Sequence, residues 1–122
     1  VSAKTFTSKV DVMLEEETKT FDYAEITLNT SISMKNLHVD SVYTTGQGDS
    51  EGAMTLSCTA EDGTEIEIRT TVLRPNDDPF SKEVITADYF LGKTIDVKGY
   101  VGVFGEDYQI EVYKVKDVTI HP

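Results

Sequence analysis

Apolar and polar residues alternate strictly along the middle of the chain, and this pattern constrains the fold more than any other feature. In residues 64–72 every second side chain is apolar or small and the others are charged or carry hydroxyls. Because successive side chains of a strand point to opposite faces, this period of two predicts a strand with one apolar face. Residues 54–60 alternate as well, and Asp62-Gly63 between the two segments suits a tight turn of primed type. The sequence therefore predicts a β-hairpin within a mainly β fold.

Three further segments have the same period of two. The first runs from Ile26 to Val42, and its pattern breaks at Lys35-Asn36, where a β-bulge is needed to keep one face inward. The second covers residues 93–104 and the third covers residues 108–120. With the hairpin these segments make five strands. The residues expected to face inward on the last two strands are Ile95, Val97, Gly99, Val101, Val103, Ile110 and Val112.

The segments between the strands predict two loops and one short helix. Residues 45–52 contain three glycines and no apolar side chain, which is typical of a loop. Residues 74–79 contain two prolines and an Asn/Asp run, which exclude the interior of a strand or helix. Residues 84–92 suit a short helix that ends at Gly92 in the left-handed conformation. The expected order is three strands, a short helix and two strands.

The N-terminal residues 1–24 have the weakest pattern and are treated as an extension that precedes a domain over residues 25–122. Ser8 could cap a short helix whose apolar side includes Val12 and Met13. The threonine-rich flanks fit an extended chain equally well. Both conformations are open on sequence grounds.

The net charge of the chain argues against some classes of binding partner. The chain of 122 residues carries 11 basic and 22 acidic side chains, a net charge of -11 at pH 7. Proteins that hold phosphates need clustered Lys and Arg, and here the basic residues are spread out. Nucleic-acid binding is therefore disfavoured. No segment approaches the length of apolar chain that crosses a membrane, so membrane insertion is not expected.

No constellation of residues indicates catalysis, a metal or a cofactor. Cys58 shares a strand face with Met54 and Leu56, which predicts a buried thiol rather than a nucleophile. His38 and His121 are the only histidines, too few for a zinc site or a catalytic triad. Acidic pairs occur on turns without the ligand spacing of an EF-hand, so solvated turn residues are expected there. These pairs are Asp49/Glu51, Glu61-Asp62, Asp77-Asp78 and Glu106-Asp107.

The C-terminal third resembles the ending of bacterial OB domains. In those domains a Gly-Lys precedes strand four, as at Gly92-Lys93, and a glycine lies within that strand, as at Gly99. A Gln-Ile opens strand five, as at Gln109-Ile110, and an Asp-Val closes the domain, as at Asp117-Val118. The resemblance implies an OB-fold-like five-stranded Greek-key barrel with a short helix between strands three and four. Such domains occur in nucleases, in nucleic-acid-binding proteins and as accessory modules of secreted or surface proteins.

The resemblance also implies a place for a ligand. OB domains bind across strands two and three and the loops beside them, through aromatic stacking and cations. The residues of this chain that suit stacking on a base, a sugar or a peptide side chain are Tyr43, Arg69, Tyr100, Phe104 and Tyr108. The alternative is that these aromatic side chains only cover the surface or ends of the barrel. Two acidic residues, Glu65 and Glu67, lie where a phosphate backbone would pass.

Together these observations predict a non-catalytic OB-fold-like binding or interaction module with a protein, peptide or carbohydrate partner. The absence of an initiator Met, the acidic Thr/Ser-rich composition and the resemblance favour part of an exported or surface-attached bacterial protein. The alternative is a single-stranded nucleic-acid-binding or nuclease-accessory domain. A third interpretation is a structural spacer between neighbouring domains.

Overall fold

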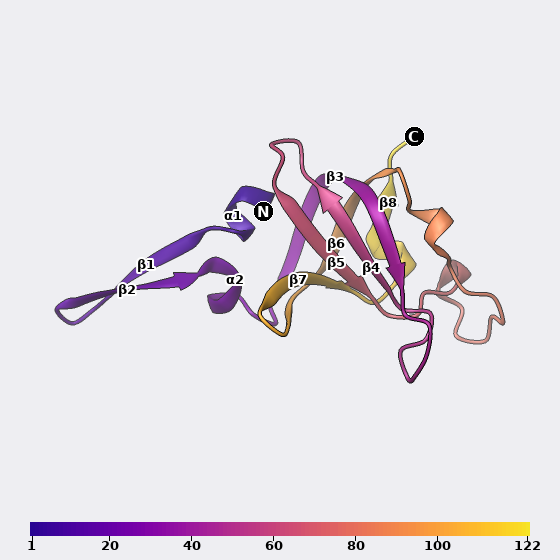
Figure 1. Ribbon diagram of the computed structural model, residues 1–122, viewed down its shortest axis with the longest axis horizontal. Coiled ribbons are helices and arrows are strands. Elements are labelled where there is room, and N and C mark those ends of the chain that lie inside the picture. The colour runs from indigo at the N-terminus through magenta and orange to yellow at the C-terminus, as the bar shows by residue number, and fades with distance from the viewer.

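A closed ring of five strands dominates the computed structural model, which describes residues 1–122 (Figure 1). Neighbouring strands are antiparallel except β5 and β7, which are parallel, and pairing of β3 with β6 closes the ring. A short strand β8 (Val118–Ile120) pairs with β6 outside the ring. The prediction of a mainly β fold with five principal strands is confirmed. In ring order these strands are β3 (Ser31–Thr44), β4 (Met54–Thr59), β5 (Glu65–Thr70), β7 (Asp107–Val112) and β6 (Thr94–Phe104).

Strand β3 is long and bent, as its sequence pattern predicts. The pairing of β3 with β6 shifts register between Met34 and Leu37, and Asn36 has a φ of 60°. This bulge confirms the break expected at Lys35-Asn36 and keeps both apolar side chains buried. The predicted start at Ile26 is wrong, because a helical turn α2 (Tyr23–Ile26) precedes the strand. The chain then reverses at Asn29, whose φ of 67° is incompatible with a strand.

The hairpin of β4 and β5 is confirmed, but its turn differs from the prediction. Only Gly63 has a positive φ, of 89°, whereas a turn of primed type I needs two such residues. The Gly63 amide donates to Ala60 O at 3.0 Å, and the Thr64 amide donates to the Asp62 carboxylate at 2.9 Å. The Asp62 carboxylate thus gives the Thr64 amide an acceptor within the turn, and this hydrogen bond lowers the pKa of Asp62.

The inward pattern on β6 is correct except at its end. Ile95, Val97 and Val101 are buried, whereas Val103 is 42% exposed because the last residues of β6 extend beyond the core into the turn that leads to β7. Gly99 lies where β7 approaches closely. A Cβ at Gly99 would overlap the main-chain carbonyl oxygen of Glu111. The two strands can therefore pair at this distance only with a glycine there.

The connection between β5 and β6 contains no helix of the predicted length. Residues 84–92 form only one 3₁₀ turn, η2 (Ala87–Tyr89). The chain before it is extended, because the Ile85 amide donates a hydrogen bond to the carbonyl oxygen of Leu73 at 2.7 Å. The β-branched residues Val84, Ile85 and Thr86 favour this extended chain. Gly92 has the expected left-handed conformation, with a φ of 77°. The predicted loop at 74–79 contains the 3₁₀ turn η1 (Pro75–Asp77).

The predicted strand at 108–120 is interrupted. Strand β7 ends at Val112, and a 3₁₀ turn η3 (Val115–Asp117) leads to β8. The Asp77 carboxylate accepts hydrogen bonds from the amides of Val115 and Lys116, at 2.7 and 3.1 Å. These bonds satisfy amides that a continuous strand would have paired, so the turn replaces the middle of the predicted strand. Ile110 and Val112 of β7 are fully buried, as predicted.

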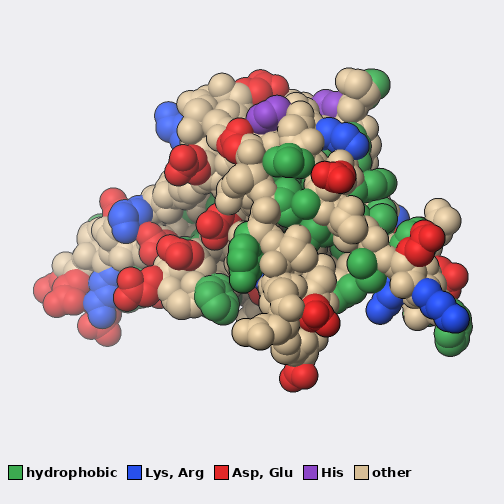
Figure 2. All heavy atoms as spheres, turned by 45° about the vertical axis from the view of Figure 1, so that its right-hand side comes forward, with side chains coloured by type: hydrophobic (Ala, Val, Ile, Leu, Met, Phe, Trp, Pro, Cys, Tyr) green, Lys and Arg blue, Asp and Glu red, His purple; other side chains and the backbone are tan.

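Of the two conformations left open for the N-terminal segment, helix or extended chain, the structure has the extended one over most of its length. After a helical turn α1 (Ala3–Phe6), β1 (Lys9–Leu14) and β2 (Glu17–Asp22) form a hairpin that projects from the ring (Figure 1). Acidic side chains gather on this projection, at the left of Figure 2. Phe6 packs into the main core, so the segment is anchored to the ring through its helical turn. None of the helices is long and apolar enough to cross a membrane.

Candidate functional site

Three of the five predicted site residues share one band across the ring. Tyr43 pairs with Thr55, and Thr55 pairs with Arg69 on the next strand. Arg69 pairs with Glu111, which in turn pairs with Tyr100. Residues paired across strands point to the same face, so these side chains lie in a row on the outside. The register of the sheet therefore brings Tyr43, Arg69 and Tyr100 to one band, although they come from three strands far apart in the sequence.

The other two predicted residues, Phe104 and Tyr108, lie at the turn between β6 and β7. Phe104 is 78% exposed and lines none of the principal hollows. Tyr108 faces the N-terminal segment, where desolvation and the nearby Glu25 and Asp22 raise the pKa of its phenol. The predicted set is therefore divided between two regions of the surface.

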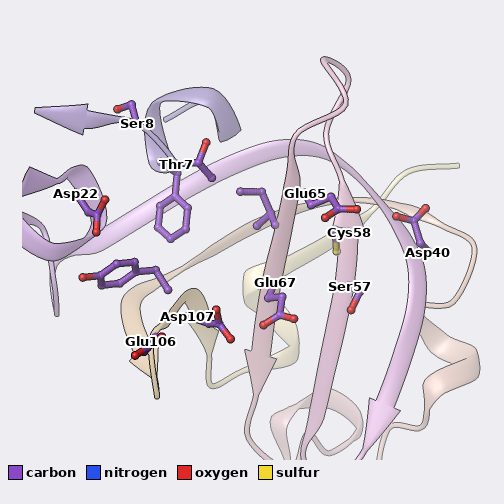
Figure 3. A pocket seen from close by; sticks show the side chains of 13 residues that line it. Thr7, Ser8, Asp22, Asp40, Ser57, Cys58, Glu65, Glu67, Glu106 and Asp107 are labelled. Carbon is purple, nitrogen blue, oxygen red and sulfur yellow. The ribbon is translucent and has the colours of Figure 1, made fainter.

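A groove of about 570 Å³ lies beside Tyr108, between the N-terminal segment, the β4–β5 hairpin and the β6–β7 turn (Figure 3). Strand alternation places Ser57, Glu65 and Glu67 outward on the hairpin, and the projecting N-terminal segment forms the opposite wall. The residues that line the groove are Phe6, Thr7, Ser8, Asp22, Asp40, Ser57, Cys58, Glu65, Ile66, Glu67, Glu106, Asp107 and Tyr108.

The groove is rich in acidic side chains. Six of its lining residues are Asp or Glu, and none is Lys or Arg. Asp22 pairs with Lys9 at 3.0 Å, and Asp40 accepts a hydrogen bond from Thr59. The other four carboxylates have no hydrogen-bond or ion-pair partner in the chain. These four are Glu65, Glu67, Glu106 and Asp107.

Apolar side chains form part of the wall of the groove. Phe6, Cys58 and Ile66 are each at most 3% exposed, and Tyr108 also lines the groove. Burial, with a smaller contribution from Asp40, raises the pKa of the Cys58 thiol to about 12. The thiol is therefore protonated at neutral pH and acts as part of the wall, in line with the burial expected from the sequence.

The chain assembles no metal centre from its acidic residues and histidines: no three of its His, Cys, Asp and Glu side chains converge in a suitable geometry. The two histidines lie near different carboxylates. His121 Nε2 lies 2.7 Å from Asp96, and His38 lies 4.0 Å from Asp40. The Asn36 amide and His121 lower the pKa of Asp96.

Sequence reasoning missed the part of the groove that comes from the N-terminal segment. Phe6, Ser8 and Asp22 belong to residues whose conformation the sequence left open. Glu106 and Asp107 were recognised only as a turn pair. Nothing local in the sequence indicates that these residues line one groove. The parallel pairing of β5 with β7 brings Glu106 and Asp107 beside β5, and the N-terminal segment packs on the other side.

No family model matches the chain, and no curated protein matches it in sequence.

Proposed function

We propose that the chain is a non-catalytic interaction module with an OB-type barrel, and that its acidic groove binds an extended, Lys- or Arg-bearing segment of a protein partner. The OB-type assignment is supported by the strand order β3-β4-β5-β7-β6, the closure between β3 and β6, and the parallel pair β5–β7. In a domain of this type the groove lies across the second and third strands of the barrel, here β4 and β5.

The observation that carries the proposal is the set of unpartnered carboxylates in the groove. These carboxylates are exposed, lie in one hollow and repel one another, and a bound cation relieves that repulsion. A Lys or Arg side chain offers several N–H donors to these oxygens. Its aliphatic stem can also lie against the apolar wall at Phe6 and Tyr108.

The shape of the groove favours a peptide over a small ion. A volume of about 570 Å³ admits more than one side chain. The carboxylates are distributed over the β5 face and the β6–β7 turn rather than gathered at one point (Figure 3). A segment with spaced cationic side chains matches this distribution better than a single metal ion does.

The same charges oppose the nucleic-acid alternative. A phosphate backbone laid along β5 would pass Glu65 and Glu67, and no groove residue offers a cation to it. The groove therefore gives no support to single-stranded nucleic-acid binding, which enters the experiment as a competing outcome. Export remains a prediction from the sequence.

The test is a fluorescence-anisotropy titration of the intact chain with three labelled probes: a short Lys/Arg-rich peptide, its Glu-rich counterpart and a single-stranded oligonucleotide. We expect only the basic peptide to bind, and its affinity to fall with added salt. The double variant Glu65→Gln/Glu67→Gln should weaken binding by about tenfold or more, since two charge-assisted contacts are lost.

The matched control is the double variant Glu16→Gln/Glu83→Gln, which removes the same charge from exposed residues outside the groove. We expect it to change the affinity little. An equal loss in both double variants would show that the peptide responds only to net charge. Salt-sensitive oligonucleotide binding would replace the proposal with the nucleic-acid alternative.

A further inference from the structure

Both arginines of the chain, Arg69 and Arg74, line one hollow of about 520 Å³ that shares no residue with the acidic groove. It lies beside the end of β5, and the loop after β3 and the residues after β7 form its other sides. The two arginines are five residues apart, so the end of β5 and the chain that follows it bring both to the same hollow.

Neither guanidinium is paired with a carboxylate, although the chain has 22 acidic side chains. Arg69 donates to the hydroxyl oxygens of Thr55 and Thr45, at 3.1 and 2.9 Å. Arg74 donates to the carbonyl oxygen of Ser81 at 2.9 Å. These bonds hold the two side chains in place and leave several of the five N–H donors of each guanidinium without an acceptor in the chain.

The carboxylate on β7 that lines the same hollow is directed elsewhere. Glu111 accepts a hydrogen bond from the Tyr113 hydroxyl at 2.8 Å, and its side chain lies over Gly102. Asp49, the other acidic residue of the hollow, is exposed on the loop after β3. The hollow is therefore lined by two arginines that have N–H donors to spare and by two carboxylates that pair with neither guanidinium.

We propose that this hollow binds a carboxylate carried on a planar ring. Guanidinium groups bind carboxylates with matching geometry and charge. A singly charged group suits the site better than a phosphate dianion, because Asp49 and Glu111 offset the two guanidinium charges and leave no excess positive charge for a second negative one. The ring has a surface to lie against, since Tyr113 lines the hollow and its ring centroid is 5.9 Å from that of Tyr100.

The probes are benzoate, its neutral analogue benzamide, acetate and inorganic phosphate, each titrated at constant ionic strength into the ¹⁵N-labelled chain. Only two arginine Nε–Hε signals exist, so both can be followed by NMR. We expect saturable shifts of both signals with benzoate, weaker binding of acetate, and binding of benzamide and phosphate at least about tenfold weaker than that of benzoate.

Substitutions separate the site from general charge effects. Arg74→Gln leaves the bonds of Arg69 to Thr45 and Thr55 intact and should weaken benzoate binding by about tenfold. Lys98→Gln removes the same charge from an exposed residue of β6 outside the hollow and should change binding little. The proposal is overturned if benzoate shifts do not saturate, if the Lys98 variant loses as much affinity, or if phosphate binds as tightly as benzoate.

Discussion

Gly99→Ala should destabilise the protein strongly, because the added methyl group meets main chain rather than a movable side chain. A Cβ at this position overlaps the carbonyl oxygen of Glu111 and touches Ile110. The clash can be relieved only by moving β6 and β7 apart, which disturbs the pairing of Tyr100 with Glu111. Overpacking of this kind costs about 2–3 kcal/mol of unfolding free energy.

Gly102→Ala on the same strand is the matched control. The added Cβ would meet only the side chain of Glu111, which can rotate away at the cost of its hydrogen bond with Tyr113. That loss of about 1 kcal/mol is offset by the lower entropy of the unfolded chain when glycine is replaced. We expect the stability of this variant to lie within about 0.5 kcal/mol of the original protein.

The assay is urea denaturation of both variants, followed by circular dichroism and fitted with a common m-value. The Gly99 variant should also melt roughly 6–10 °C lower in a thermal scan. If the two variants lose equal stability, or if Gly99→Ala is neutral, then close approach of the β7 main chain is not the reason for glycine at this position.

Three other outcomes follow from burial and from the pKa shifts. Val97→Asp should cost several kcal/mol of unfolding free energy while Lys98→Asp costs little, and equal melting temperatures would show that the register of β6 is wrong. Asp96 has a lowered pKa, so its carboxylate stabilises the fold at neutral pH and this stabilisation is lost as the pH falls below the ordinary value. Asp96→Asn should therefore flatten acid denaturation curves in that range, and an unchanged curve would contradict the assignment. The Cys58 thiol should react with a thiol reagent only after denaturant is added, and rapid labelling of the native chain at pH 8 would contradict its burial.

The strands that could be predicted from the sequence are those with one apolar face and one polar face. Along β4 and β5 the alternation is local and continuous, so their existence and inward faces follow directly from the residues. The pattern does not show where a strand leaves the core, and this is why Val103 was expected to be buried. It also does not show that the Asp77 carboxylate accepts hydrogen bonds from the amides of Val115 and Lys116, where the last predicted strand is interrupted.

The candidate sites were less predictable because they depend on contacts between distant segments. Arg69 was recognised by its residue type, and the sheet register places it in one band with Tyr43 and Tyr100. Arg74 follows it by only five residues, but the other sides of their hollow come from the loop after β3 and the end of β7, which no local pattern describes. The acidic groove likewise exists only once the N-terminal segment has packed beside the β4–β5 hairpin.

Closure of the ring between β3 and β6 has a consequence for synthesis of the chain. Strands β3, β4 and β5 leave the ribosome first, and the partners that complete the ring, β6 and β7, follow the long connection after β5. At about 5–20 residues per second the nascent three-stranded sheet waits several seconds with both outer strands unpaired. Charged residues on an unpaired edge strand oppose edge-to-edge pairing, so Glu65 and Glu67 on β5 would disfavour pairing between neighbouring nascent chains at this stage. The carboxylates that line the groove of the finished protein would then also act on the unfinished one.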